Sequence, residues 1–162
     1  MRSMIFAVAT SLGLALGQPA AACLVEAPTI LEDVLLADVV VVGRVSEYSV
    51  IRPLRSARLP GYARIELQVD EVLVGNAPQT LTMTWVNSTF GIPEAIGDGP
   101  FLIALRAPTS AAPPLRGPSA TIFRTPEPEL LTILQAPCAR PFLFDALSEE
   151  SEVVRQLLGD RP

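Results

Sequence analysis

Two cysteines, Cys23 and Cys138, are the residues of this 162-residue chain best suited to covalent chemistry. The chain has no histidine and no Cys-x-x-Cys pair, which excludes a cysteine–histidine zinc site, a redox dithiol and a Ser-His-Asp triad. Two cysteines of an exported protein most simply pair with each other. The sequence therefore predicts a Cys23–Cys138 disulfide, with no metal and no cofactor.

The segment before Cys23 has the features of an export signal. Arg2 precedes a short apolar stretch, and residues 20–22 are three alanines that form a small-residue cleavage site directly before Cys23. A membrane-spanning helix needs about 18 or more apolar residues, and neither this stretch nor any later one is that long. We expect residues 1–22 to be a signal peptide and residues 23–162 to form one periplasmic or secreted domain. Lipidation of Cys23 is the alternative, because lipoprotein signals also place a cysteine after small residues.

Arginines form a second candidate site on a chain whose formal net charge is −5. Four of them lie in or beside the connection between two expected strands: Arg52, Arg55, Arg58 and Arg64. Such a cluster can bind carboxylate, phosphate or sulfate groups. The alternative is a solvated loop whose charges are balanced by nearby acids. The acidic balance of the whole chain argues against binding to nucleic acid.

Paired carboxylates offer little for acid–base catalysis. Asp70 and Glu71 are neighbours in an expected strand, so their side chains point to opposite faces and are poorly placed to cooperate unless a bulge intervenes. Glu149 and Glu150 fall in the first turn of an expected helix, where acids interact favourably with the helix dipole. No glycine-rich phosphate loop is present. We therefore expect no enzymatic activity.

Five strands are predicted from runs of β-branched residues and from the alternation of apolar and polar residues. They cover residues 39–45, 62–74, 80–85, 101–105 and 120–123. In the first strand, Gly43 suits a bend and Arg44 an outward side chain. In the third strand, Trp85 alternates with other core residues and is expected to pack in the core rather than bind a ligand.

Two helices and a long loop complete the expected domain. Thr29 and Glu32 have the spacing of a capping box, which predicts a short helix that ends near Ala37. Ser148 can cap a C-terminal helix over residues 147–159, whose apolar stripe would pack on the body. The proline-rich residues 108–118 are expected to form a loop.

Three motifs occur in order between the two cysteines: residues 37–45 (ADVVVVGRV), 69–75 (VDEVLVG) and 99–105 (GPFLIAL). With Cys23 and Cys138 they resemble the family of tissue inhibitors of metalloproteinases and netrin-like modules. The resemblance covers nearly the whole of the expected mature chain. It implies a mainly β fold, a five-stranded Greek-key barrel of the OB type with a short N-terminal helix and a C-terminal helix.

The resemblance also implies two functions. In the inhibitors, the amine and carbonyl of the first mature cysteine chelate the zinc of the target protease, a role that only Cys23 matches here. The inhibitors have a second cysteine two residues later, where this chain has Val25, and a cysteine usual before the fourth strand is missing too. We expect an exported binding or structural module that contacts a protein or an anionic surface ligand, with these candidate contact residues: Cys23, Arg52, Arg55 and Arg58. The alternative is a metalloprotease inhibitor that acts through Cys23.

Overall fold

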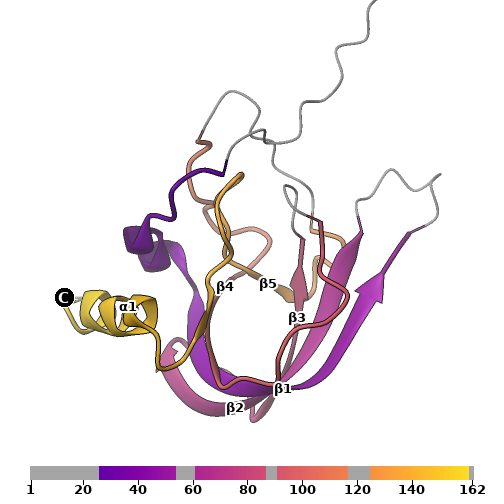
Figure 1. The fold of residues 1–162 in the computed structure, drawn as a ribbon, viewed down its shortest axis with the longest axis horizontal. Helices are drawn as coiled ribbons and strands as arrows, with labels where there is room; N and C mark the ends of the chain where they lie inside the picture. Colours follow the sequence, from indigo (N-terminus) through magenta and orange to yellow (C-terminus); the bar gives the residue numbers. More distant parts are fainter. Residues whose placement is uncertain (1–25, 54–60, 87–90, 117–124, 161–162) are drawn as a thin grey trace, which may run out of the picture.

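The computed structural model describes residues 26–53, 61–86, 91–116 and 125–160. Six strands and two helices follow one another along this part of the chain (Figure 1). In order they are the 3₁₀-helix η1 (Leu31–Leu36), β1 (Val39–Ile51), β2 (Tyr62–Val74), β3 (Thr80–Trp85), β4 (Phe101–Arg106), β5 (Leu131–Ile133), β6 (Leu143–Asp145) and the α-helix α1 (Glu149–Gly159).

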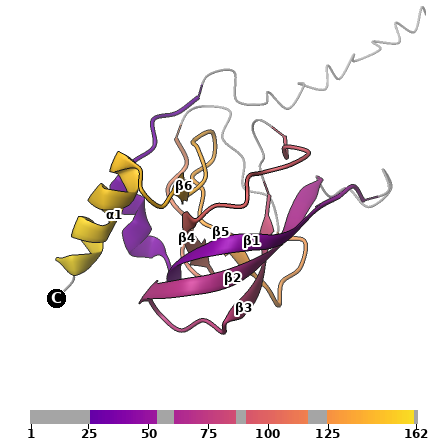
Figure 2. The same ribbon diagram turned by 60° about the horizontal axis from the view of Figure 1, so that its bottom comes forward.

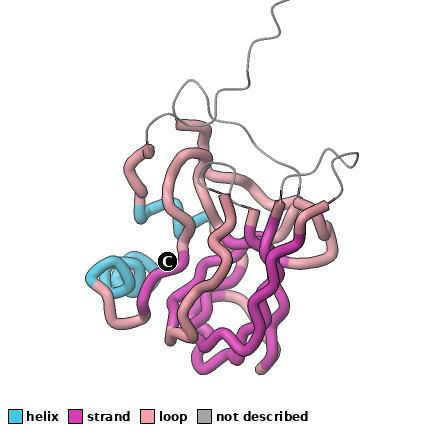
Figure 3. The backbone as a smooth tube through the Cα atoms, turned by 45° about the vertical axis from the view of Figure 1, so that its right-hand side comes forward, coloured by secondary structure: helices cyan, strands magenta, loops and turns pink. Residues whose placement is uncertain are grey.

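Strands β1 to β5 close into a barrel. β1 pairs in antiparallel fashion with both β2 and β4, and β3 pairs in parallel with β5, so that the order β1-β2-β3-β5-β4 returns to β1. This mixed five-stranded barrel is OB-like, and the expected fold class is confirmed. β6 pairs with Phe101–Ile103 of β4, along the same edge that β5 occupies at Leu105–Arg106. Figures 2 and 3 show both helices on one side of the barrel.

The strands separate two apolar cores because successive side chains point to opposite faces. The barrel interior is filled by Val41, Ile65, Leu67, Met83, Ile103 and Leu105, all fully buried. An outer core lies between the barrel wall and the helices and contains Val34, Val40, Leu102, Leu134, Phe142 and Val154. Trp85 belongs to the barrel interior, as expected, and its indole N–H donates to Gln135 Oε1 at 3.1 Å.

The long strand β1 is curved (Figure 1), and its pairing with β2 is irregular around Gly43. The pairing of β1 with β2 shifts register at three places, one of them between Val42 and Gly43. A Cβ at position 43 would lie 2.4 Å from the Gln68 carbonyl oxygen, so only glycine allows β2 to approach this closely. Next to it, Arg44 points outward and pairs with Asp70 at 3.5 Å. The expected outward arginine is confirmed.

The structure contains strand residues beyond the predicted ones at three places. β1 continues to Ile51 rather than stopping at residue 45, because its second half pairs with β2 as far as Tyr62. The fifth barrel strand is β5, a segment that showed no strand pattern, while residues 120–123 lie outside the described residues. β6 was not predicted either. Both missed strands have only three residues.

The helix predictions are partly confirmed. Ser148 caps α1, since its Oγ accepts a hydrogen bond from Ser151 N at 3.2 Å. The capping box at Thr29 is wrong: η1 is a 3₁₀-helix that starts after Ile30 and has no side-chain cap. The proline-rich segment is a loop as far as residue 116, and its last two residues lie outside the described part.

Candidate functional site

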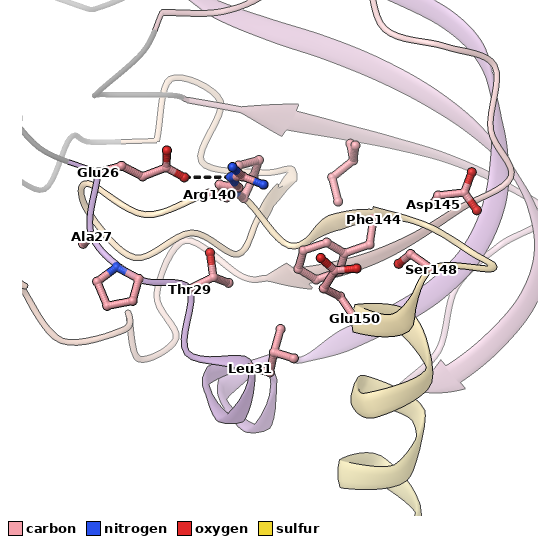
Figure 4. Close-up of a pocket in the computed structure, with 12 residues that line it drawn as sticks. Glu26, Ala27, Thr29, Leu31, Arg140, Phe144, Asp145, Ser148 and Glu150 are labelled. Atoms are coloured by element: carbon pink, nitrogen blue, oxygen red, sulfur yellow. Dashed lines mark hydrogen bonds and ion pairs between the residues drawn. The ribbon is translucent and has the colours of Figure 1, made fainter.

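A pocket of about 850 Å³ opens beside β6, where the chain segment before η1 passes the start of α1 (Figure 4). We call it the N-terminal pocket. Its walls come from residues 26–31, from residues 140–145 and from the first turn of α1. The two ends of the described chain therefore build it together.

Backbone and side-chain contacts hold the N-terminal segment in place. Ala27 N donates to the Cys138 carbonyl at 2.8 Å, and Arg140 Nε donates to the Glu26 carboxylate at 2.7 Å. Cys138 is buried, is not a free thiol, and adopts a φ of 71°, a left-handed conformation that is rare for residues other than glycine. The turn around Cys138 thus fixes where the N-terminal segment lies.

The pocket combines an apolar wall with acidic side chains. Leu31 and Phe144 contribute apolar surface, and the Phe144 ring rests edge-on against the buried ring of Phe142, with centroids 5.6 Å apart. Around this wall stand three carboxylates and one guanidinium: Glu26, Asp145, Glu150 and Arg140. Since Arg140 is already paired with Glu26, the lining carries a net negative charge.

Family-model comparison finds no match to this chain, and a comparison with curated proteins finds no significant match. Within the described ranges, no group of three or more His, Cys, Asp or Glu side chains is placed to hold a metal ion. No helix among the same residues has both the length and the apolar character to cross a membrane.

The arginines singled out in the sequence are not brought together at this pocket. Arg52 directly follows β1, whose C-terminal end lies on the side of the barrel away from the helices (Figure 1). The exposed guanidinium of Arg52 pairs with Glu94. Arg64 pairs with Glu127, with Nε 3.1 Å from Oε1. Arg55 and Arg58 lie outside the described residues. Each of the two described arginines is therefore balanced by a nearby acid, as the alternative interpretation expected.

The two adjacent acids of β2 are engaged separately. Asp70 faces Arg44, whereas Glu71 accepts two hydrogen bonds from Arg155 of α1, the shorter at 2.7 Å. The hydrogen bonds from Arg155 lower the pKa of Glu71. Glu71 therefore links β2 to α1, while Asp70 pairs with an arginine of β1.

The pairing of Glu127 with Arg64 leads to a pH prediction. The Glu127 side chain is only 10% exposed, and hydrogen bonds from Arg64, assisted by one from Tyr62, lower its pKa. A carboxyl whose pKa is lower in the folded state stabilises the fold above its unfolded pKa, about 4.3 for glutamate, and loses that contribution as the pH falls through the folded value. We expect the free energy of unfolding to fall less on acidification in Glu127→Gln than in the unmodified protein.

Urea unfolding between about pH 6 and pH 3 measures this difference. Glu129→Gln is the matched control, because Glu129 is an exposed carboxylate of the same loop that acts on Arg64 only through its charge, without the hydrogen bonds that Glu127 makes. The control should follow the unmodified protein. Equal acid dependence in Glu127→Gln and in the unmodified protein would show that the Arg64 pair does not contribute.

No local pattern in the sequence indicates the N-terminal pocket. Its lining joins segments from the two ends of the chain, as the ion pair of Glu26 and Arg140 across 114 positions illustrates. Phe144, Asp145 and Glu150 each have an ordinary local interpretation as core, turn or helix-start residues. Only the closure of the barrel and the addition of β6 bring them beside the N-terminal segment.

Proposed function

We propose that this protein is an exported binding module that holds a partner protein at the N-terminal pocket. The observation that carries this proposal is the pocket itself, whose 850 Å³ falls within the range of about 300–1,000 Å³ typical of ligand sites. An OB-like barrel serves many functions, so the site rather than the fold supports the proposal. The described residues bring no catalytic constellation to the pocket, and its apolar wall with charged groups around it suits recognition.

Export and a Cys23–Cys138 disulfide belong to the proposal. Cys138 is not a free thiol, and Cys23 is the only other cysteine of the chain. The hydrogen bond from Ala27 to Cys138 is consistent with this pairing, because Ala27 follows Cys23 by only four positions. A disulfide that closes a loop of about 115 residues stabilises a fold by roughly 4–5 kcal/mol in the chain-entropy model.

Intact mass spectrometry tests both statements on protein isolated from the producing cells. The expected mature chain starts at Cys23 and gains no alkyl groups until it is reduced. A lipid on Cys23 would appear as added mass. Two thiols that alkylate without reduction would rule out the disulfide.

Photocrosslinking tests the binding function. A p-benzoylphenylalanine residue in place of Pro28, an exposed residue of the pocket, should give a discrete adduct in the producing cells. The control carries the same residue in place of Gln68, which is exposed on the barrel wall away from the pocket. An adduct from position 28 alone supports the proposal. No adduct, or equal adducts from both positions, contradicts it.

Metalloprotease inhibition is the second candidate function, and the anchored N-terminal segment favours it. The contacts of Glu26 and Ala27 hold the chain close behind Cys23, which the chelation of a protease zinc by the Cys23 amine would require. A neutral amine is available near pH 7, because the α-amino pKa is about 8 and zinc competes with the proton. Protein that starts at Cys23 should then inhibit a zinc protease, and the same protein extended by one alanine should not. Equal inhibition by both forms would exclude chelation.

A further inference from the structure

The strand β6 has one edge without a partner strand in the described part of the chain. Its inner edge pairs with β4, and Ala104 N donates to Phe142 O at 3.1 Å while Ala146 N donates to Pro100 O at 3.0 Å. Backbone groups alternate in direction along an antiparallel strand. Residues 142, 144 and 146 therefore face β4, and the backbone groups of Leu143 and Asp145 point to the open side.

The N–H and C=O groups of Leu143 and Asp145 are the four outward backbone groups, and two of them already form hydrogen bonds within the protein. Leu143 N donates to Pro141 O at 2.8 Å, and Asp145 O accepts from Ser148 N at 3.0 Å and from Ser151 Oγ at 2.7 Å. The other two, Leu143 O and Asp145 N, have no hydrogen-bond partner among the described residues. An acceptor and a donor thus remain open on either side of Phe144.

This spacing matches a parallel strand rather than an antiparallel one. In a parallel pair, one residue of the incoming strand donates its N–H to the carbonyl before its opposite residue and accepts from the N–H after it. A partner residue opposite Phe144 would bond to Leu143 O and Asp145 N in this way. Because paired residues share a face of the sheet, its side chain would lie on the side of Phe144, which lines the N-terminal pocket.

The lining of the pocket indicates which side chain fits there. Leu31 and Phe144 offer apolar surface to a methylene stem, and Glu150, whose carboxylate forms no ion pair in the described part, offers a counter-charge to its end. The net negative charge of the lining repels acidic side chains. Arginine and lysine combine an aliphatic stem with a terminal cation.

We propose that the partner protein supplies an extended basic segment, which adds to the open edge of β6 as a parallel strand and places an arginine or lysine opposite Phe144 in the N-terminal pocket. The backbone bonds at Leu143 O and Asp145 N align the segment, and the pocket selects the side chain. This inference rests on the proposed binding function and names the partner of that same site.

Peptide pools with one fixed residue test the proposal on the full mature chain. Acetylated and amidated pentapeptide pools carry arginine, lysine, leucine or glutamate at the centre and mixed residues elsewhere. We expect the arginine and lysine pools to bind at least about tenfold more tightly than the glutamate pool, and to slow hydrogen exchange of the Asp145 amide in NMR spectra. Equal affinity of all pools, tightest binding of the leucine pool, or no binding would overturn the proposal.

Charge variants separate the pocket from general attraction to an acidic protein. Glu150→Gln should weaken the arginine pool about fivefold. Glu149→Gln is the matched control, because Glu149 is an exposed acid of the same helical turn that does not line the pocket, and it should leave the affinity unchanged. Equal weakening by both variants would mean that the overall charge of the protein causes the effect, and it would overturn specific recognition in the pocket.

N-methylated peptides test the strand geometry. Methylation of the central arginine nitrogen removes the N–H that would bond to Leu143 O, and it should abolish binding. Methylation of the following residue, whose N–H faces away from β6, should be tolerated. Equal effects would overturn parallel addition. If no peptide binds but the crosslink at position 28 still forms, the basic segment is wrong and the binding function stands. If neither the peptides bind nor the crosslink forms, both proposals are wrong.

Discussion

Replacing Phe142 with alanine is expected to lower the free energy of unfolding by about 3–5 kcal/mol. The Phe142 side chain is 1% exposed in the outer core, and its ring supports Phe144 from below the N-terminal pocket. Truncation removes apolar burial and leaves a cavity that the surrounding backbone cannot close, because Phe142 N and O are hydrogen bonded to Leu134 and Ala104. Such a loss is a large share of the roughly 5–15 kcal/mol typical of a domain.

Urea unfolding followed by the fluorescence of Trp85, the only tryptophan, measures the change. Leu147→Ala is the control, since Leu147 is 90% exposed and its truncation should leave the stability unchanged. A loss below about 1 kcal/mol in Phe142→Ala would contradict the placement of an outer core between the barrel and the helices.

Gly43→Ala is the second substitution with a large expected effect. Its Cβ would lie 2.4 Å from Gln68 O and 2.9 Å from Leu67 Cγ, so β1 and β2 would have to separate at this position. Because the obstacle includes backbone, we expect a loss of at least about 3 kcal/mol, at or above the usual range for overpacking.

The same denaturant titration tests this substitution. Gly159→Ala provides the comparison: Gly159 ends α1, a Cβ added there would meet nothing within 4 Å, and the change should be neutral or slightly stabilising. If Gly43→Ala were as stable as Gly159→Ala, the close approach of β2 to Gly43 would be wrong.

Local patterns were sufficient to predict most of the barrel. The alternation in the first half of β2 reflects one buried and one more exposed face, and this signal does not depend on distant contacts. The three-residue strand β5 gives no such pattern, because its identity comes from parallel pairing with β3 at Met83 and Thr84. The second half of β1 was missed because its exposed and half-buried residues form no continuous apolar run.

The site was beyond sequence reasoning for a related reason. A cluster of arginines in the sequence predicts an anion-binding site. In the structure, however, Arg52 and Arg64 each pair with an acid that is distant in the sequence. The open edge of β6 depends on which backbone groups its pairing with β4 consumes, and residue types do not encode that. Cys138 was identified from the cysteine count, yet its contact with Ala27 required the folded chain.

The yield of the crosslink from Pro28, compared between Glu150→Gln and Glu149→Gln proteins in the producing cells, tests the central claim most directly. The two variants carry the same charge and differ by one position in the first turn of α1. We predict a severalfold lower yield in Glu150→Gln and an unchanged yield in Glu149→Gln. Equal yields in the two proteins would contradict recognition of a basic partner segment at the N-terminal pocket.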